Sequence, residues 1–208
     1  MNGREQKPPS DKTGESLMKS SLPDEELMFL VRNGVVEMLG VLFDRYQSPL
    51  FNFYCKLTGD RSASEDLVQD VFYRILKYRK SYQSGMSFKS WMYQIARNAR
   101  LDQAKRQKPE GDLEDESASN RISAFGAGDP VQHDQEVELL HRALMRLPEE
   151  KREVLVLSRF QNLKYEEIAQ TTGIEVGAVK VRVHRALNEL REIFRQLETG
   201  QAPVIKNT

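Results

Sequence analysis

The stretch from Val71 to Lys108 combines basic and aromatic side chains within a chain of 208 residues whose formal net charge is zero. Its rings are Phe72, Tyr73, Tyr78, Tyr82, Phe88, Trp91 and Tyr93, and its single acid is Asp102. Basic groups hold phosphates and flat rings stack on unpaired bases, so this composition predicts a surface for single-stranded nucleic acid. A basic helical hairpin whose rings all lie in the core would give the same composition.

Helical spacing separates these residues into two groups. Over 88–107, one face collects apolar side chains that include Phe88 and Trp91, which we expect in the core. The opposite face carries Tyr93, Arg97 and Arg100, so Tyr93 is predicted to be exposed and able to contact a ligand. Asp102 is expected to pair with a basic residue one turn later in the same helix, Arg106.

The helix that precedes this one is predicted to show an acidic outer face. Ser62 and Glu65 have the spacing of a capping box, which places the helix start near residue 62. Beyond it, Asp66, Asp70 and Tyr73 lie opposite the apolar stripe, with Gln69 beside them. Acids in the first turn can simply complement the helix dipole, but Asp70 lies beyond the reach of that effect.

A second motif lies near the C-terminus. Residues 165–186 have the form of a helix-turn-helix, with a short helix, a turn at Gly173 and a long second helix. One face of the second helix is apolar, whereas the other is small and basic, as a helix in a DNA major groove requires. That outer face consists of Gly177, Ala178, Val181, His184 and Arg185, flanked by Lys180 and Arg182. Helix-turn-helix shapes also occur as plain packing units.

Length and composition predict an all-α protein of two small helical domains joined by a flexible acidic linker. The expected divisions are a disordered tail over 1–23, a helical domain over 24–108, the linker over 109–134, a helix-turn-helix domain over 135–198 and a flexible tail over 199–208. The linker carries acids between Gly and Pro residues, and a solvated spacer would have the same composition.

Several function classes find little support. The one cysteine, Cys55, indicates a buried residue in a reducing cytoplasm, and no apolar run is long enough for a membrane span. The histidines lack metal-ligand spacing. No nucleophile or pair of acids suggests an enzyme, so we expect no metal, no cofactor and no catalytic residue.

The chain resembles bacterial RNA polymerase sigma factors of the extracytoplasmic-function type, which carry only the second and fourth conserved sigma regions. The resemblance covers roughly 24–108 and 136–197 in family order. The segments that match the family are 64–72, 88–98 and 102–106 in the first domain, and 147–155, 165–169 and 177–186 in the second. The helix-turn-helix alone would be weak evidence, but joined to the first block it is specific.

The resemblance implies three sets of site residues. Those matching the surface for the β′ clamp helices of core polymerase are Asp66, Gln69, Asp70 and Tyr73. Those matching the part that opens the −10 element are Gln83, Ser84, Tyr93, Arg97, Arg100, Lys105 and Arg106. Those matching the −35 reader are Ala178, Lys180, Val181, Arg182, His184 and Arg185. The sequence departs from the family at Ala178 and Val181, where a small hydroxyl residue is usual.

The resemblance also implies partners: core RNA polymerase through its clamp helices and β flap, promoter DNA, and an anti-sigma factor. It implies a cytoplasmic chain that is monomeric when free. Two other interpretations remain: a sigma mimic that sequesters an anti-sigma factor, and a conventional operator-binding regulator that uses only the helix-turn-helix. The mimic has little reason to retain the basic residues of 97–106, and the regulator has no need of the basic stretch.

Overall fold

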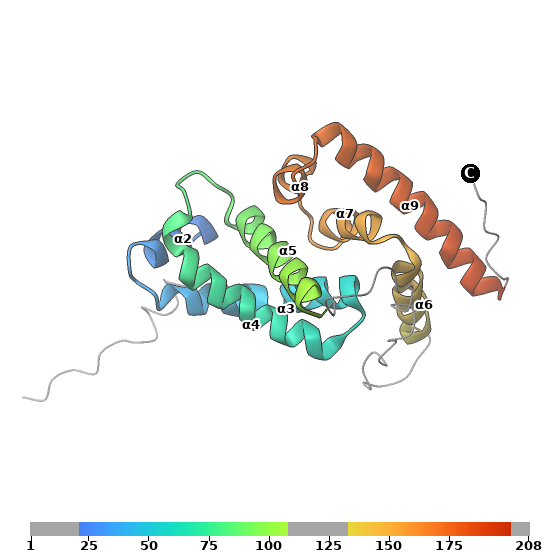
Figure 1. The fold of residues 1–208 in the computed structure, drawn as a ribbon, viewed down its shortest axis with the longest axis horizontal. Helices are drawn as coiled ribbons and strands as arrows, with labels where there is room; N and C mark the ends of the chain where they lie inside the picture. The colour runs from blue at the N-terminus through green and yellow to red at the C-terminus, as the bar shows by residue number, and fades with distance from the viewer. Residues whose placement is uncertain (1–20, 108–132, 201–208) are drawn as a thin grey trace, which may run out of the picture.

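The computed structural model describes residues 21–107 and 133–200 (Figure 1). The predicted N-terminal tail, linker and C-terminal tail fall mostly or wholly outside these ranges. The described residues form helices and no strands. The elements are α2 (Asp24–Arg32), α3 (Met38–Thr58), α4 (Arg61–Tyr78), the short η1 (Arg79–Ser81), α5 (Phe88–Gln107), α6 (His133–Arg146), α7 (Glu149–Arg159), α8 (Tyr165–Thr172) and α9 (Val176–Thr199). The all-α prediction is confirmed, and no described helix is long and apolar enough to cross a membrane.

The junction between α3 and α4 shows how local chemistry sets the helix ends. Gly59 has a φ of +71° and ends α3 in a left-handed cap. Asp60 then caps α4 by accepting a 2.9 Å hydrogen bond from the Ala63 N–H. The predicted capping box on Ser62 is therefore wrong, because a better acceptor lies two residues earlier. Glu65 instead lies 3.6 Å from the Arg61 guanidinium, one turn before it.

Helices α2 to α5 form the first unit. Helix α3 runs unbroken through Pro49 and packs against α4 and α2, while α4 packs against α5. Phe72, Phe88 and Trp91 are buried as predicted, with Trp91 only 7% exposed. Several ring pairs of this unit meet edge to face, for example the partly buried Phe43 with Phe72 at 4.9 Å between centroids, a geometry that adds to the stabilisation from burial alone.

Helices α6 to α9 form the second unit, in which α7, α6 and α8 all pack on α9. The apolar stripe of α9 is buried as predicted, through Val179, Val183, Ala186 and Leu190. Gly173 has a φ of +76° and makes the turn between α8 and α9. The two last helices therefore form the predicted helix-turn-helix.

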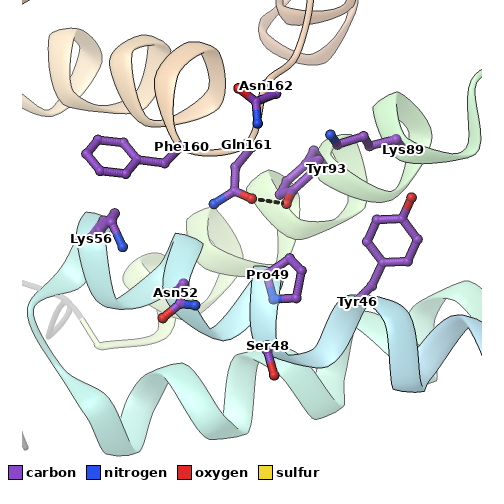
Figure 2. Close-up of a pocket in the computed structure, with 10 residues that line it drawn as sticks. All are labelled: Tyr46, Ser48, Pro49, Asn52, Lys56, Lys89, Tyr93, Phe160, Gln161 and Asn162. Atoms are coloured by element: carbon purple, nitrogen blue, oxygen red, sulfur yellow. Dashed lines mark hydrogen bonds between the residues drawn. The ribbon is translucent and has the colours of Figure 1, made fainter.

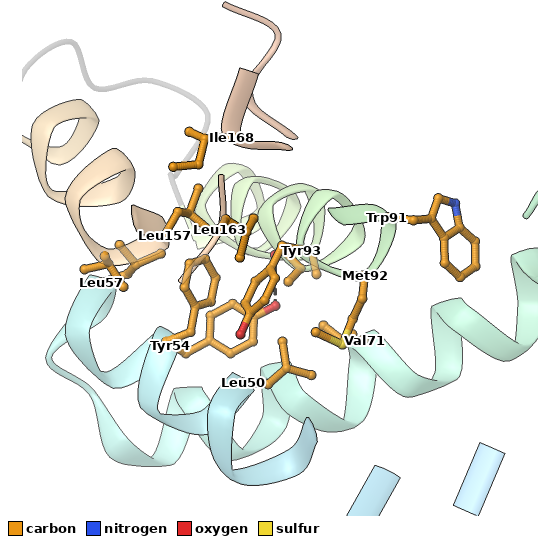
Figure 3. Packing of buried hydrophobic residues seen from close by; sticks show 14 of the residues in the cluster. Leu50, Tyr54, Leu57, Val71, Trp91, Met92, Tyr93, Leu157, Leu163 and Ile168 are labelled. Atoms are coloured by element: carbon orange, nitrogen blue, oxygen red, sulfur yellow. Dashed lines mark hydrogen bonds between the residues drawn. The ribbon is translucent and has the colours of Figure 1, made fainter. Parts of the chain in front are cut away.

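The two units share one apolar core. Helices α6 and α7 pack on α3, and α8 packs on α5. Figure 3 shows Leu157 and Leu163 of the second unit beside Tyr54, Leu57 and Tyr93 of the first. The sequence predicts two domains, and in the structure the two units pack against each other.

We expect Gly59→Ala to lower the free energy of unfolding by about 1–2 kcal/mol, because a left-handed backbone is strained for any residue with a Cβ. The new Cβ would also lie 3.2 Å from Sδ of Met145 on α6. Urea unfolding followed by circular dichroism measures the change. Gly40→Ala is the matched control, since Gly40 lies inside α3 with nothing within 4 Å of the added Cβ. It should stabilise the chain by about 0.5–1 kcal/mol, and equal effects at the two sites would contradict the argument.

Candidate nucleic-acid interface

The outer face of α4 is open, as predicted. Asp66 and Gln69 are exposed, and Tyr73 is 63% exposed. Asp70 is partly engaged, because it accepts a 2.9 Å hydrogen bond from Arg74. These four residues, Asp66, Gln69, Asp70 and Tyr73, are called the α4 surface below. An exposed tyrosine ringed by polar groups is typical of a residue that a protein partner covers.

Asp102 has a different partner from the predicted one. Its carboxylate accepts a 2.7 Å hydrogen bond from Nη1 of Arg74 on α4, rather than pairing with Arg106 in its own helix. The Arg74 guanidinium lowers the pKa of Asp102 below its ordinary value. Because α4 packs closely on α5, the contact between helices replaces the pair within one helix. Asp102 therefore joins α4 to α5, and Lys105 and Arg106 are left exposed at the end of α5.

The loop before α5 has one fixed ring and an exposed tip. Tyr82 is 1% exposed and donates a 2.6 Å hydrogen bond from its hydroxyl to the Met86 carbonyl. Burial raises the pKa of Tyr82 to about 12. Gln83 and Ser84 are exposed at the tip, followed by Gly85 with a φ of +87°. A rigid base therefore presents the two polar residues that the resemblance assigns to the −10 element.

Tyr93 is buried, so the prediction of an exposed ring is wrong. Its exposed fraction is 0%, and its ring meets Phe53 edge to face at 5.1 Å between centroids. Its hydroxyl donates a 2.6 Å hydrogen bond to Oε1 of Gln161, in the segment between α7 and α8 (Figure 2). Burial raises the pKa of Tyr93 above its ordinary value. The outer face of α5 lies against the second unit instead of solvent.

The arginines of the same face form ion pairs with the second unit. Nε of Arg97 lies 3.2 Å from Oε1 of Glu153 on α7, and Arg100 pairs with Glu149 in the first turn of α7. Arg100 is 8% exposed, and Glu153 is 6% exposed. The predicted −10 residues thus divide into two groups. The first is exposed at the loop tip and the α5 terminus. The second contacts the second unit, and in it Tyr93 and Arg100 are buried while Arg97 is half-buried.

A third carboxylate from the second unit meets the start of α5. Oε1 of Glu167 on α8 accepts hydrogen bonds from the hydroxyls of Ser87 and Ser90, at 3.0 and 3.1 Å. Its Oε2 accepts from the N–H of Lys164 at 2.8 Å, which satisfies a free donor at the start of α8. Burial alone would raise the pKa of Glu167, but these hydrogen bonds outweigh burial and lower it.

Sequence reasoning missed these partners of α5. Acids such as Glu149 in the first turn of α7 look like ordinary complements of a helix dipole. Gln161 falls in a short connection between helices and carries no periodic signal. Nothing in the pattern of either unit shows that Glu153 or Glu167 faces a helix far away in the sequence.

The outer face of α9 is exposed as predicted. Ala178, Lys180, Val181, His184 and Arg185 are exposed, and Val181 is 50% exposed. Arg182, at the edge of this face, lies 3.3 Å from Glu150 of α7. We call these six residues the α9 face. A methyl-bearing side chain among basic groups can contact a thymine methyl while its neighbours hold phosphates.

A half-open pocket of about 370 Å³, lined by both polar and apolar side chains, lies between the two units and is bounded by α3, α5 and the segment after α7 (Figure 2). Lys56 and Lys89 both line it, and Nζ of Lys56 lies 4.9 Å from the centroid of the Phe160 ring. Burial lowers the pKa of Lys56. Within 21–107 and 133–200, no group of three His, Cys, Asp or Glu side chains is placed to hold a metal ion.

Acidification should weaken the contact between the units. The hydrogen bond from Arg100 lowers the pKa of Glu149, and that of Glu167 is lowered as described, both from an ordinary value of 4.5. Their stabilisation is therefore fully present above that value and is lost as pH falls through the lower folded pKa values. We expect the urea midpoint to fall, as pH is taken from neutral to well below 4.5, by less in Glu149→Gln/Glu167→Gln than in the wild type. Parallel loss in both proteins would contradict this assignment.

Two family models match the chain. The model for sigma-70 region 2 matches residues 42–110, and the model for sigma-70 region 4 matches residues 137–190. Together they cover more than half of the chain. The first contains the α4 surface and all of α5, and the second contains α7, α8 and the α9 face.

Individual relatives give the same assignment. The chain is 30% identical over 167 residues to the RNA polymerase sigma factor CarQ of Myxococcus xanthus, covering 80% of this chain and 95% of the relative. It is 31% identical to the ECF RNA polymerase sigma factor SigE of Mycolicibacterium smegmatis, covering 77% of this chain but only 64% of the relative.

Among solved structures, the sigma factor RpoE in complex with the anti-sigma factor NepR from Bartonella quintana is similar. The TM-score is 0.60 at 26% sequence identity, and the match covers 74% of this chain and 94% of the other.

Proposed function

Since the chain belongs to the extracytoplasmic-function type of the sigma-70 family, we propose that it is an alternative sigma factor that binds core RNA polymerase, recognises −10 and −35 promoter elements and promotes DNA melting. The observation that carries the proposal is the presence of two exposed functional faces of different chemistry on one chain. The α4 surface is acidic with a central tyrosine, and the α9 face is basic. An operator-binding regulator needs only the second.

The α4 surface is the proposed site for the β′ clamp helices of polymerase. Asp66 and Gln69 are exposed on it, and Tyr73 supplies a large apolar contact. Aromatic residues in the centre of an interface commonly dominate its affinity. Asp70 is fixed by Arg74, which in turn is held by Asp102, so its carboxylate is presented in one orientation.

The proposed −35 reader is the α9 face, and the proposed −10 reader combines the loop tip with α5. Lys180, Arg182 and Arg185 would hold phosphates, while Ala178 and Val181 approach base edges without hydroxyl groups. Gln83 and Ser84 would meet a base taken out of the stack. Tyr93 would stack on a base, which returns about 1–3 kcal/mol against the few kcal/mol that unstacking costs.

Its partners under this proposal are core polymerase through the clamp helices and β flap, promoter DNA, and an anti-sigma factor, acting in the cytoplasm without any catalytic residue of its own. The structural relative from Bartonella quintana, which is a sigma factor held by an anti-sigma factor, supports the last partner.

Run-off transcription on genomic fragments with purified core polymerase tests the proposal. The full chain should bind core and produce transcripts with defined starts that core alone does not make. Binding to core without any transcript would refute initiation and favour the sigma mimic. Tight binding to specific duplex DNA without affinity for core would favour the operator-binding regulator.

A further inference from the structure

The pocket of about 370 Å³ between the two units is lined by two lysines and by no Asp or Glu side chain (Figure 2). Its volume lies within the range of small-molecule sites. Lys56 comes from α3 and Lys89 from the start of α5, and Figure 2 shows them on opposite sides of Tyr93 and Gln161. Neither lysine forms an ion pair with a carboxylate of residues 21–107 or 133–200. The pocket is therefore electropositive.

The two lysines have no carboxylate that could serve them without a ligand. Lys56 is half-buried with its Nζ against the Phe160 ring, and burial lowers the pKa of its ammonium. Lys89 acts on the charge of Glu167, but both oxygens of that carboxylate already accept hydrogen bonds from other groups. An anion beside a partly desolvated ammonium favours its charged form. A negative group in this pocket would thus stabilise the protonated state of Lys56.

A buried amide offers a hydrogen-bond donor to the same space. Gln161 is 6% exposed, and its Oε1 accepts the 2.6 Å hydrogen bond from the Tyr93 hydroxyl. That bond fixes the orientation of the amide, so its Nε2 is directed to the side of the pocket where Lys56 and Asn52 lie (Figure 2). No residue of the described chain accepts a hydrogen bond from this nitrogen. A donor held in place without a protein acceptor indicates a site for a bound acceptor.

The neighbouring residue adds a backbone feature. Asn162 has a φ of +53° and is the one residue other than glycine with a left-handed backbone among those described. Such conformations are uncommon away from glycine and collect at ligand sites. Its side chain lines the pocket with those of Gln161 and Asn52, so three amides accompany the two lysines. Side-chain amides pair with the edges of purine bases through one donor and one acceptor.

We propose that this pocket binds a small nucleoside phosphate, whose phosphates pair with Lys56 and Lys89 and whose base lies against the amides. The rings of Phe160 and Tyr46 supply flat apolar surfaces in the same lining. The inference goes beyond the proposed function, because neither the α4 surface nor the α9 face contributes to the pocket. Since both units supply lining residues, a bound nucleotide should raise the thermal midpoint of the chain.

Isothermal titration of the full-length chain at fixed ionic strength tests the proposal with three probes: adenosine 5′-diphosphate, inorganic pyrophosphate and adenosine. We expect the diphosphate to bind at one site and more tightly than either part alone. Lys56→Gln/Lys89→Gln should weaken its binding at least about tenfold, because charge-assisted hydrogen bonds to phosphate are lost. The matched control is Lys77→Gln/Lys80→Gln, which removes two exposed lysines of the same unit outside the pocket. It should bind like the wild type.

Asn52→Asp gives a second variant if the lysine variant does not fold. Asn52 is exposed on α3, and the substitution keeps its size while placing a negative charge in the lining. It should also weaken the diphosphate at least about tenfold and should abolish the rise in thermal midpoint. No binding of the diphosphate at millimolar concentration would overturn the proposal. Equal weakening in the Lys77 and Lys80 control would overturn it too, because net charge would then be the cause. Binding of pyrophosphate as tight as that of the diphosphate would exclude a nucleotide site.

Discussion

Arg97→Ala/Arg100→Ala should strongly decrease promoter opening while leaving the affinity for core polymerase unchanged. Each guanidinium is proposed to hold a backbone phosphate of the melted strand, and a hydrogen bond to a charged group contributes about 1.5–3 kcal/mol. Losing two of them predicts a decrease of roughly 100-fold or more in open-complex formation. The measurement is transcription from a promoter identified by run-off, together with the affinity for core polymerase.

A matched control separates the effect of these two positions from the loss of two positive charges. Arg191→Ala/Arg195→Ala removes two exposed cations from α9, where their partners are Asn188 and Glu192 of the same helix. This variant should open promoters like the wild type. The α5 variant also loses the ion pairs of Arg97 with Glu153 and of Arg100 with Glu149. If it opened promoters normally, α5 could not be the strand-binding helix.

Asp66→Arg/Tyr73→Ala should greatly weaken binding of the chain to core polymerase. Truncating an aromatic hot spot costs about 2 kcal/mol or more, and opposing like charges in an interface costs several kcal/mol. Together they predict a loss of affinity for core of roughly three orders of magnitude. Because both side chains are exposed, the helix content and thermal midpoint should not change.

Fluorescence anisotropy of labelled chain titrated with core polymerase measures this loss. Glu37→Arg is the control. Glu37 is exposed just before α3, so this substitution makes the same change of charge at a position outside the α4 surface. It should retain wild-type affinity. Normal binding by the Asp66 and Tyr73 variant would place the polymerase contact elsewhere on the chain.

The fold within each unit could be predicted from the sequence, because each unit buries one apolar stripe per helix. The stripe of α9 continues past Leu190 to Phe194, which packs on the core, and leaves Val181 outside, as the spacing indicates. The buried Trp91 follows from the same argument. The helix ends are harder to predict, because the cap at Asp60 depends on a single local hydrogen bond.

The packing of one unit on the other could not be predicted, and neither could the burial of Tyr93. A helical wheel identifies an interface by its apolar residues. The outer face of α5 instead meets the second unit through polar partners, Gln161, Glu149 and Glu153, and such a face has the same pattern as one in water. Only the structure distinguishes a basic face that is solvated from one that is paired.

The covered state of α5 also explains why exposure alone is a poor guide to the site. Lys105 and Arg106 are exposed at the end of α5, whereas Arg100 of the same helix is buried in a pair. All three belong to one proposed DNA surface. Their different exposure reflects the position of the second unit.

Permanganate reactivity of thymines near the transcription start tests the central claim most directly, because only unpaired thymines react. With the full-length chain, core polymerase and a run-off promoter, the account predicts reactive thymines from the −10 element to the start site. Core alone and the chain alone should give none. A promoter that stays fully paired in the complete complex would contradict the proposal that this chain opens DNA.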